Sequence, residues 1–372
     1  MKIVITGGLG FIGQHLATRL IAAGHDVLLV DSLIAQIHGD IPSVSVPEGA
    51  RVVRLDTSLL PEHPELIDGS DAVFHLAAET GTAQSMYRIA HYTGVNCGGT
   101  AALLEAIAKC SKRPRHVVLA SSRSVYGEGA YVRPDAPTQL LQPAARAPEA
   151  LAAGDWEPRD ASGVALVAVP TPESLPFAPG SIYAATKAAQ ELLINSTATA
   201  LGFRSTVFRF QNVYGEGQSL QNPYTGIITI FFNRARQGLD IPLYEDGLES
   251  RDFVHVSDIA AALHASLSTD LPPGAVINLG AGQPTSVRTL ASSLLQAAGI
   301  DVPVRVTGQF RVGDIRHCHA DLGLARRLMG FEPQVTLDEG LRRFCAWGVG
   351  QPVHEDRSAA ATAELRSKGL TK

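Results

Sequence analysis

Short apolar runs alternate with amphipathic stretches through the first 210 residues of the chain. Runs rich in Val, Ile, Leu and Phe are typical of strands that are buried on both faces. They occur at residues 2–6, 26–30, 51–55, 71–77, 115–120 and 203–210. Stretches with helical spacing of apolar residues separate most of them. Because strands that alternate with helices form parallel βαβ units, the pattern predicts an α/β fold, a Rossmann doubly wound parallel sheet.

The pattern changes after residue 210, where the predicted elements become shorter and the loops more polar. Helices are predicted at residues 227–237, 259–267 and 287–298, and strands at residues 241–244 and 275–279. We therefore expect a smaller C-terminal α/β domain over residues 211–350, interleaved with a Rossmann domain over residues 1–210. Residues 351–372 are polar and lack a core pattern, which predicts a loosely attached tail.

Residues 128–180, called the insert below, interrupt the Rossmann pattern. They are rich in Pro, Ala and Gly, as irregular loops are. The insert contains neither Cys nor His, so we expect no metal site within it. Because it separates two segments with candidate chemistry, we expect it to fold over the mouth of the site or at a subunit interface. The pattern does not predict its internal structure.

A glycine-rich turn follows the first predicted strand. It reads Gly7-Gly8-Leu9-Gly10-Phe11-Ile12-Gly13. In dinucleotide-binding turns the first glycine permits the tight turn, the second lets the backbone approach a pyrophosphate, and the third allows close helix–strand packing. The amides at the start of the next helix then face the phosphates.

An acidic residue, Asp31, ends the second predicted strand, 18 residues after Gly13. A carboxylate at this position accepts hydrogen bonds from an adenosine ribose diol and repels a 2′-phosphate. No arginine follows it closely. The sequence therefore predicts a site for NAD rather than NADP.

The ends of the next two strands supply further candidates for the NAD site. Asp56 and Thr57 follow the third strand, and Asp56 is equally well explained as a contact to the adenine edge or as a helix cap. Leu76, Ala77 and Ala78 lie at the end of the fourth strand and are candidates too, because the small side chains of Ala77 and Ala78 would let a cofactor lie close. His75, just before them, is expected to pack within the sheet.

Candidate acid–base chemistry lies in the segment 181–187, which reads Ser-Ile-Tyr-Ala-Ala-Thr-Lys. Ser181 can cap a helix, and on that helix Tyr183 and Lys187 would share one face. A neighbouring ammonium favours the phenolate and is expected to lower the pKa of Tyr183. This short motif is weak alone. Its catalytic interpretation is supported by the dinucleotide turn and by Ser122 at the end of another predicted strand.

Composition excludes several other classes of function. The 372 residues include 31 Lys and Arg against 36 Asp and Glu, a net charge of −5, which gives no electrostatic footprint for nucleic acid. The four cysteines lie far apart, so neither zinc nor a redox pair is indicated, and no metal is expected. No apolar run is long enough to span a membrane, and no signal peptide is recognised. We expect a cytoplasmic protein with reduced thiols.

Six motifs occur in an order that is itself informative. They are Gly7-Gly8-x-Gly10-x-x-Gly13, His75-Leu76-Ala77-Ala78, Ser121-Ser122-x-x-Val125-Tyr126-Gly127, Tyr183-x-x-x-Lys187, Arg209-x-x-Asn212-Val213-Tyr214-Gly215 and Arg251-Asp252-Phe253-Val254-x-Val256. In this order they resemble the extended short-chain dehydrogenase/reductase family, in particular its NAD-dependent nucleotide-sugar epimerases and dehydratases. The resemblance covers about residues 1–350.

The resemblance implies roles for the candidate catalytic residues. Tyr183 would be the base, Lys187 would bind the nicotinamide ribose and lower the pKa of Tyr183, and Ser122 would hydrogen-bond the reacting sugar oxygen. Asn96 resembles the family asparagine on the helix behind the site. The helices that begin at residues 85 and 181 resemble those of the family's four-helix dimer interface, which implies a homodimer.

The resemblance also implies a nucleotide-sugar substrate in the C-terminal domain. Arg251 and Arg311 would pair with its pyrophosphate, because a guanidinium matches phosphate oxygens, and Asn212 would donate to the same group. For Arg251 the alternative is a surface ion pair with Asp252. Arg123 is explained at least as well by a structural ion pair as by contact with the substrate.

The reaction implied is a 4-epimerisation. Dehydratases of this family carry an Asp-Glu pair after the catalytic hydroxyl, whereas this chain has Arg123 and Ser124. Residues 79–87 and 153–159 resemble the family members that interconvert dTDP-L-rhamnose and dTDP-6-deoxy-L-talose. Three alternatives stay open: an epimerase for UDP-sugars, a reductase or dehydrogenase that releases its cofactor at each turnover, and a non-enzymatic NAD-sensing regulator.

Overall fold

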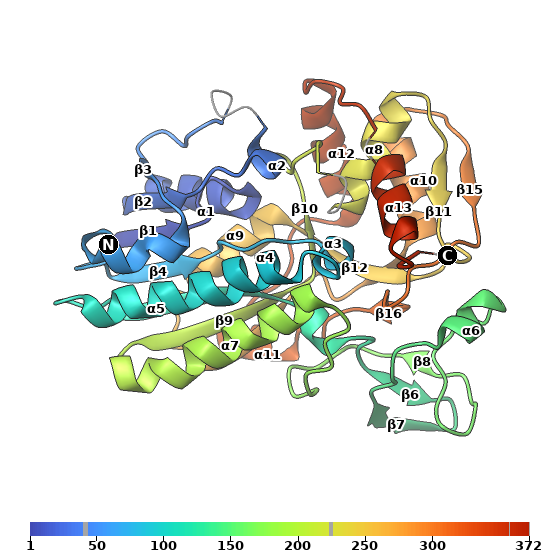
Figure 1. The fold of residues 1–372 in the computed structure, drawn as a ribbon, viewed down its shortest axis with the longest axis horizontal. Coiled ribbons are helices and arrows are strands. Elements are labelled where there is room, and N and C mark those ends of the chain that lie inside the picture. Colours follow the sequence, from blue (N-terminus) through green and yellow to red (C-terminus); the bar gives the residue numbers. More distant parts are fainter. Residues whose placement is uncertain (40–43, 223–225, 357, 372) are drawn as a thin grey trace.

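A parallel sheet of seven strands forms the centre of the molecule (Figure 1). The structure is a computed structural model that describes residues 1–39, 44–222, 226–356 and 358–371. In spatial order the strands are β3 (Arg51–Arg54), β2 (Asp26–Asp31), β1 (Lys2–Thr6), β4 (Ala72–His75), β5 (His116–Ser122), β9 (Arg204–Phe210) and β13 (Ala275–Leu279). This is the doubly wound Rossmann order that the sequence predicts.

Helices cover both faces of the sheet and bury an apolar core on each side. On one face lie α1 (Phe11–Ala22), α9 (Val256–Ala265) and α11 (Gly323–Met329), and on the other α5 (Gly99–Lys109) and α7 (Ile182–Leu201). The first core includes Leu16 and Ile259, and the second includes Ile107 and Ile194. Because β13, α9 and α11 follow residue 211 in sequence, the two parts of the chain interleave.

The rest of the C-terminal part folds beside the carboxyl ends of these strands. Its strands are β10 (Asn212–Tyr214), β12 (Ser250–His255), β14 (Pro284–Ser286), β16 (His317–Cys318), β11 (Ile241–Leu243) and β15 (Val304–Val306). Its helices are α8 (Ile227–Arg236), α10 (Val287–Ala298) and α12 (Leu337–Val349). They share a third apolar core around Phe232, Leu290 and Phe344.

Short elements connect the long ones near the sheet edge. They are α2 (Ala35–His38), η2 (Thr57–Glu62), η3 (Pro64–Leu66), α3 (Thr82–Ser85), α4 (Ile89–Thr93), the π-helical turn η4 (Gly94–Gly98) and η5 (Arg123–Tyr126). Within the described residues, no helix has the length and apolar character needed to cross a bilayer.

The insert has more structure than its composition indicates. It forms a small sheet and one helix, namely β6 (Tyr131–Arg133), β7 (Ala136–Leu141), β8 (Val167–Ala168) and α6 (Pro148–Ala152). Figure 1 shows it as a green lobe beside the C-terminal part of the chain. Ion pairs join the two: Arg146 of the insert pairs with Glu245, and Glu157 of the insert pairs with Arg316. These partners are distant in sequence, so composition alone could not reveal the lobe.

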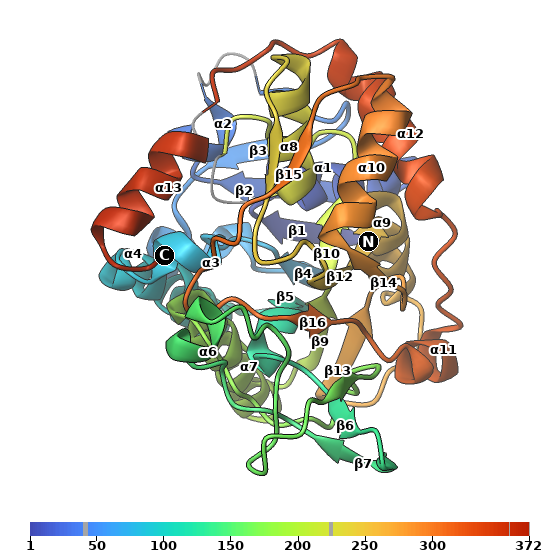
Figure 2. The same cartoon turned by 90° about the vertical axis from the view of Figure 1, so that its right-hand side faces the viewer.

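The C-terminal segment differs from the expected loose tail. It contains α13 (Ser358–Ser367), whose Ala361 and Leu365 are buried. Figure 2 shows α13 alongside α3 and α4 of the Rossmann part and near α8. The two buried residues lie four positions apart on a helix whose other residues are alanine, polar or charged, so the apolar face is too narrow to stand out as a core pattern.

Helix α7 is fixed at its ends and its middle. The Ser181 hydroxyl accepts a hydrogen bond from the amide of Ala184, and Gly202 ends the helix in the left-handed conformation. In the middle, Glu191 accepts hydrogen bonds from Arg209 of β9 and from the Ser121 hydroxyl of β5. Both members of the Glu191–Arg209 pair are buried. The helix is thus tied to the two strands beside it.

The replacement Glu191→Ala is expected to lower the free energy of unfolding by about 3–5 kcal/mol, because it leaves the Arg209 charge buried without its partner. Urea denaturation measures the change. Glu105→Ala is the matched control, because Glu105 forms an exposed pair with Lys109 on neighbouring α5 and should contribute about 0.5 kcal/mol or less. Equal losses in the two variants would contradict the structural role of Glu191.

Candidate active site

The glycine turn packs directly against the end of β4. A Cβ atom on Gly7, whose φ is +68°, would lie 2.6 Å from the amide nitrogen of Ala77. A Cβ on Gly13 would lie 2.6 Å from the carbonyl oxygen of Gly7. The backbone therefore forms a close cradle that only glycine permits, and α1 begins at Phe11 with Gly10 as its N-cap.

The residues predicted to line this cradle lie at the same sheet edge. Phe11 and Ile12 form the first turn of α1, and Leu76, Ala77 and Ala78 leave β4 next to it. The Leu76 amide donates to the Thr6 carbonyl at 3.0 Å, so the chain follows the sheet for one more residue before it turns.

Asp31 lies at the end of β2 and is almost fully buried. Its two carboxylate oxygens accept hydrogen bonds from the amides of Leu9 (3.0 Å) and Leu33 (2.9 Å), and His38 lies 3.6 Å away. Burial alone would raise the pKa of Asp31, but the His38 contact and the two amides outweigh it and lower the pKa. The carboxylate is thus ionised, and lone pairs remain for further donors.

The two candidates after β3 have local structural roles. Asp56 caps η2, because its carboxylate accepts from both the amide and the hydroxyl of Ser58 at 2.9 and 2.7 Å. Of its two interpretations, the cap is the one seen in this structure. Thr57 is buried, and its hydroxyl packs so closely against α5 that a Cβ on Gly99 would lie 2.5 Å from it.

Ser122, Tyr183 and Lys187 meet where β5 ends beside the start of α7. Ser122 and Tyr183 share a hydrogen bond. One helical turn further on, the buried Lys187 ammonium donates to the carbonyl of Ala120 at 2.8 Å. The structure therefore brings together the three side chains that the sequence singled out as catalytic candidates.

The prediction that the pKa of Tyr183 is lowered by Lys187 is wrong. Burial raises the pKa of Tyr183, and the opposing influences come from the Ser122 hydrogen bond and the Arg123 charge rather than from Lys187. Burial also lowers the pKa of Lys187 to about 8, so its charge is itself disfavoured. Helical spacing fixed which side chains share a face but could not give their degree of burial.

Asn96 and His75 stabilise the framework behind the site. Asn96 is fully buried, and its amide bonds to the backbone of Glu79 and, at 2.9 Å, to the Thr186 hydroxyl, so it joins the loop after β4 to α7. His75 lies between the hydroxyls of Thr6 and Thr100 at 2.7 and 2.9 Å, and burial lowers its pKa to about 3. It packs within the sheet, as predicted.

A cavity with cationic groups lies between the two parts of the chain. Its walls include Asn212, Arg251, Arg311 and Asp314. The Nε atom of Arg311 is buried and has no hydrogen-bond partner among the described residues, and its guanidinium lies 4.7 Å from the centre of the Tyr244 ring. Arg123 reaches the same region and donates from Nε to Asn212 at 3.0 Å.

Arg251 does not form the surface ion pair considered as its alternative. It is buried, and it donates to the carbonyls of Ser250, Ile315 and Arg316 and contacts Asp314 at 3.4 Å. Asp252 instead accepts from three backbone amides, and burial raises its pKa to about 6. The alternation of strand β12 directs the two side chains to opposite sides.

Sequence reasoning missed several residues of the cavity. Helix α8 supplies one wall with Ile227, Ile230, Phe231 and Arg234. Tyr244 and the buried Glu249, whose pKa burial raises to about 7, line it too. Glu191 was also missed, although it continues the four-residue spacing from Tyr183 through Lys187. The four-residue spacing could have revealed Glu191 from the sequence. The sequence of α8, in contrast, shows only an ordinary amphipathic helix and gives no sign that the helix lines a cavity.

Arg316 has a structural role, because it is almost fully buried and forms ion pairs with Glu157, Glu245 and Asp246. Among the residues that the structure describes, no cluster of three or more His, Cys, Asp or Glu side chains is placed to hold a metal ion.

Proteins of the short-chain dehydrogenase/reductase class combine a Rossmann glycine turn with a Tyr-x-x-x-Lys helix at the same sheet edge, and this chain has both. Its similarity to known proteins is more specific. Residues 3–149 and 162–280 match the NAD dependent epimerase/dehydratase family. The chain belongs to this family, whose cofactor is NAD.

Known relatives resemble the chain over nearly its whole length. A dTDP-L-rhamnose 4-epimerase from Burkholderia thailandensis is 37% identical over 349 residues, which cover 93% of this chain and 94% of the relative. The structure of UDP-glucose 4-epimerase with UDP-glucose from Thermotoga maritima has a TM-score of 0.76 at 27% identity and covers 94% and 99% of the two chains. A Thermus thermophilus UDP-glucose 4-epimerase in complex with NAD has a TM-score of 0.73 at 26% identity, covering 95% and 100%.

The low pKa of Lys187 predicts a stability that depends on pH. Between pH 8 and the ordinary lysine pKa of about 10.4, the unfolded chain binds the Lys187 proton and the folded chain does not. Stability relative to a Lys187→Met variant should therefore rise with pH in this window, by roughly 1 kcal/mol per pH unit. Below pH 8 the difference should be flat.

Urea denaturation of both proteins from pH 7 to 10 measures this difference. Lys109→Met, at an exposed position on α5, provides the baseline for replacing a lysine. A wild-type advantage that does not change with pH would show that Lys187 keeps its proton throughout this range.

Proposed function

We propose that the chain is an NAD-dependent nucleotide-sugar 4-epimerase that interconverts dTDP-L-rhamnose and dTDP-6-deoxy-L-talose through a transient 4-keto sugar. The observation that carries the proposal is the hydrogen-bonded pair of Ser122 and Tyr183, with Lys187 one turn away, beside a cavity that contains Arg251 and Arg311. A base, a hydroxyl and arginine side chains for a diphosphate are the protein groups that this reaction needs.

The glycine cradle supports NAD as the cofactor, because Gly7 and Gly13 let the turn pack tightly against β4 and against itself, which is the backbone arrangement that a dinucleotide pyrophosphate site requires. Gly7, Gly10 and Gly13 would hold its pyrophosphate together with the first turn of α1, and Asp31 would hold its adenosine ribose. When bound, NAD supplies the acceptor and donor for the hydride of the sugar carbon. Lys187 has two further N–H groups that can reach ribose hydroxyls.

The protein's own chemistry centres on one proton. Tyr183 would take it from the sugar 4-hydroxyl as the C4–H bond breaks, and would return it when that bond forms again on the other face. Ser122 would hold the reacting oxygen in hydrogen-bond reach of Tyr183. Because burial raises the pKa of Tyr183, the phenolate needs nearby positive charge, which Arg123 already contributes.

The cavity fits the diphosphate part of the substrate. Among the described residues, the buried Nε of Arg311 has no hydrogen-bond partner, and Arg251 is held in place by three carbonyls, so both present a charge without further ordering. Asn212 accepts from Arg123 and keeps its amide hydrogens for the substrate. This arrangement favours a bound nucleotide sugar over a free sugar.

Two observations favour epimerisation over related reactions. The residues after Ser122 are Arg123 and Ser124, so the carboxylates that a dehydratase uses for elimination are missing at these positions. The 37% identical relative supports dTDP-L-rhamnose as the substrate, with UDP-sugar epimerases as the second candidate because two structural relatives act on UDP-glucose. A reductase would release its cofactor at each turnover, and a regulator would not need an intact base.

The proposal includes a cytoplasmic homodimer. Helices α5 and α7 lie side by side on one face in Figure 1, and Ile89 and Leu192 on this side are 50% and 58% exposed. Burying such apolar groups would favour pairing. A light-scattering mass of two chains at micromolar concentration is expected, and a mass of one chain would refute it. All four cysteines are free, as in cytoplasmic proteins.

The decisive measurement is NMR of the purified protein with dTDP-L-rhamnose in deuterated buffer without added cofactor. The 4-epimer is expected to form with no deuterium at C3, C4 or C5, because the hydrogen moves within the site and the cofactor is retained. Deuterium in the product would indicate an epimerase that works by deprotonation. Stoichiometric conversion of added NAD to NADH would favour the alternative of a reductase or dehydrogenase that releases its cofactor at each turnover.

A Tyr183→Phe variant should lose turnover by about 10²–10⁴-fold and keep its bound NAD. Ser124→Ala is the matched control, because the Ser124 hydroxyl lies two residues from Ser122 and makes no hydrogen bond in the described structure. Its turnover should stay near that of the wild type. Unchanged turnover in Tyr183→Phe would exclude this residue as the base.

A further inference from the structure

Helix α13 forms the outer wall of the cavity that contains Arg251 and Arg311. The residues of α13 that line the cavity are Ser358, Ala361, Thr362 and Leu365. Their spacing is i, i+3, i+4 and i+7, so they form one continuous face of the helix. The lining residues of α8 have the same spacing, from Ile227 to Arg234. Two helix faces thus bound the same cavity, and each contributes apolar side chains.

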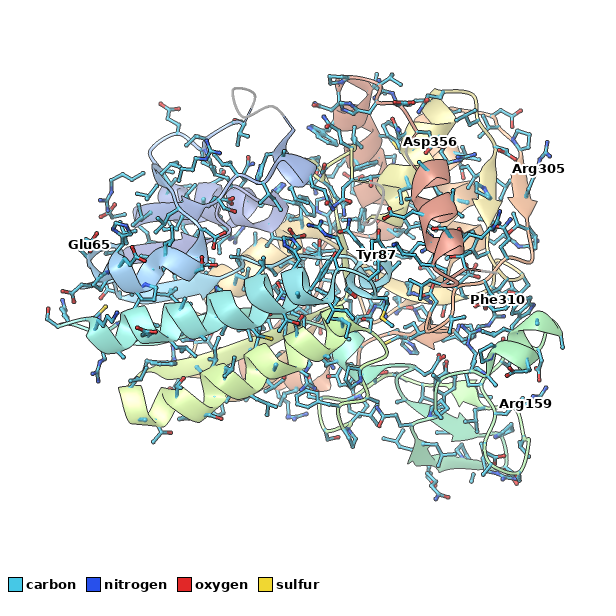
Figure 3. All side chains as sticks on the ribbon, viewed as in Figure 1. Glu65, Tyr87, Arg159, Arg305, Phe310 and Asp356 are labelled. Atoms are coloured by element: carbon cyan, nitrogen blue, oxygen red, sulfur yellow. The ribbon has the colours of Figure 1, made fainter. Side chains whose placement is uncertain are left out.

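Helix α13 is attached to both parts of the chain. At its start, Asp356 pairs with Arg234 of α8, and Arg234 also donates to Ser358 at 3.3 Å. At its end, the Lys368 ammonium lies 4.8 Å from the centre of the Tyr87 ring, between α3 and α4. Figure 3 labels Asp356 and Tyr87 near opposite ends of the helix. Helix α13 therefore bridges the C-terminal part and the Rossmann part.

The middle of the helix and the residues after it contact the groups proposed for the diphosphate. The hydroxyls of Thr362 and Tyr244 lie 3.4 Å apart, and Arg311 lies over the face of the same tyrosine ring. Beyond the helix, Thr371 pairs with Arg311 as an isolated β-bridge, and the Val312 amide donates to Leu370 at 3.2 Å. A displacement of α13 would therefore disturb the contacts that position Arg311.

The attachment of α13 is weak compared with that of the other helices. Ala361 and Leu365 are its only buried apolar side chains among the residues whose burial is described. Neither side chain belongs to the three apolar cores. Among the described residues the remaining contacts are few and polar, and they include the Arg234–Asp356 pair, the Thr362 and Tyr244 hydroxyls, and Lys368 over the Tyr87 ring. A helix held in this way can leave its position without unfolding the three apolar cores.

We propose that α13 is part of the nucleotide site: it forms the wall that covers the nucleoside, so that ligand entry and release require it to move away. The inference rests on the proposed nucleotide-sugar function. With the diphosphate at Arg251 and Arg311, the apolar space between α8 and α13 is where a flat base would lie, and Ala361 and Leu365 would cover it. Bound nucleotide would in turn hold α13 in place.

The test uses the full chain and three nucleotides, dTDP, UDP and GDP, so that it does not depend on epimerisation. Calorimetry gives each Kd, and hydrogen exchange reports on residues 358–371. In the wild type, the tightest nucleotide should slow exchange in this segment by about tenfold or more. Failure of all three to bind, or exchange unaffected by a bound nucleotide, would overturn the proposal.

Two variants of α13 separate the wall from the rest of the helix. Leu365→Ser removes the buried side chain and should weaken nucleotide binding by about tenfold, with dissociation accelerated. Ala363→Ser changes an exposed position of the same helix and should bind as the wild type does. Unchanged affinity in Leu365→Ser would overturn the proposal.

Retained NAD and the melting temperature show whether each variant is folded. The outcomes for the two hypotheses differ. A protein that binds dTDP through α13 and does not epimerise dTDP-L-rhamnose would keep this inference and lose the proposed function. An active epimerase in which nucleotide binding leaves hydrogen exchange of α13 unchanged would keep the proposed function and lose this inference.

Discussion

The buried ion pair between Glu191 and Arg209 fixes the position of the reactive side chains. Glu191 lies on the same face of α7 as Tyr183 and Lys187, and it is bound to β5 through Ser121 and to β9 through Arg209. Arg209 also donates to the Tyr126 hydroxyl at 2.9 Å, which in turn donates to Asn278 of β13 at 2.8 Å. One buried charge pair thus aligns a helix with three strands. Such a pair contributes little net stability but is costly to break, which makes it suited to fixing geometry.

Burial and charge act against each other throughout the site. Burial raises the pKa of Tyr183 and lowers that of Lys187, so both groups are biased towards their neutral forms before any ligand binds. Arg123 and the Ser122 hydrogen bond oppose this for Tyr183. A base of this kind would become effective only when its surroundings gain positive charge, which couples its chemistry to occupancy of the site.

Two segments that are distant in sequence support the same loop of the C-terminal part. From the insert, Arg146 donates to the carbonyl of Asp314 at 2.9 Å. From the C-terminus, Thr371 pairs with Arg311. The loop that carries Arg311 and Asp314 is therefore held from both sides. Loop residues placed by a rigid scaffold are a common basis for ligand recognition, and here the scaffold includes parts of the chain with no strong pattern of their own.

Features that depend on local spacing could be predicted from the sequence. The glycine turn, Asp31 at the end of β2 and the pair Tyr183–Lys187 could be predicted because each rests on residues close together in a strand or helix. Tertiary structure decided the rest. The cavity joins Asn212, Arg251, Arg311 and α13, and the insert lobe depends on ion pairs between residues more than 90 positions apart, such as Arg146 and Glu245. The sign of the Tyr183 pKa shift was decided in the same way, because burial is a property of the packed fold and not of a motif.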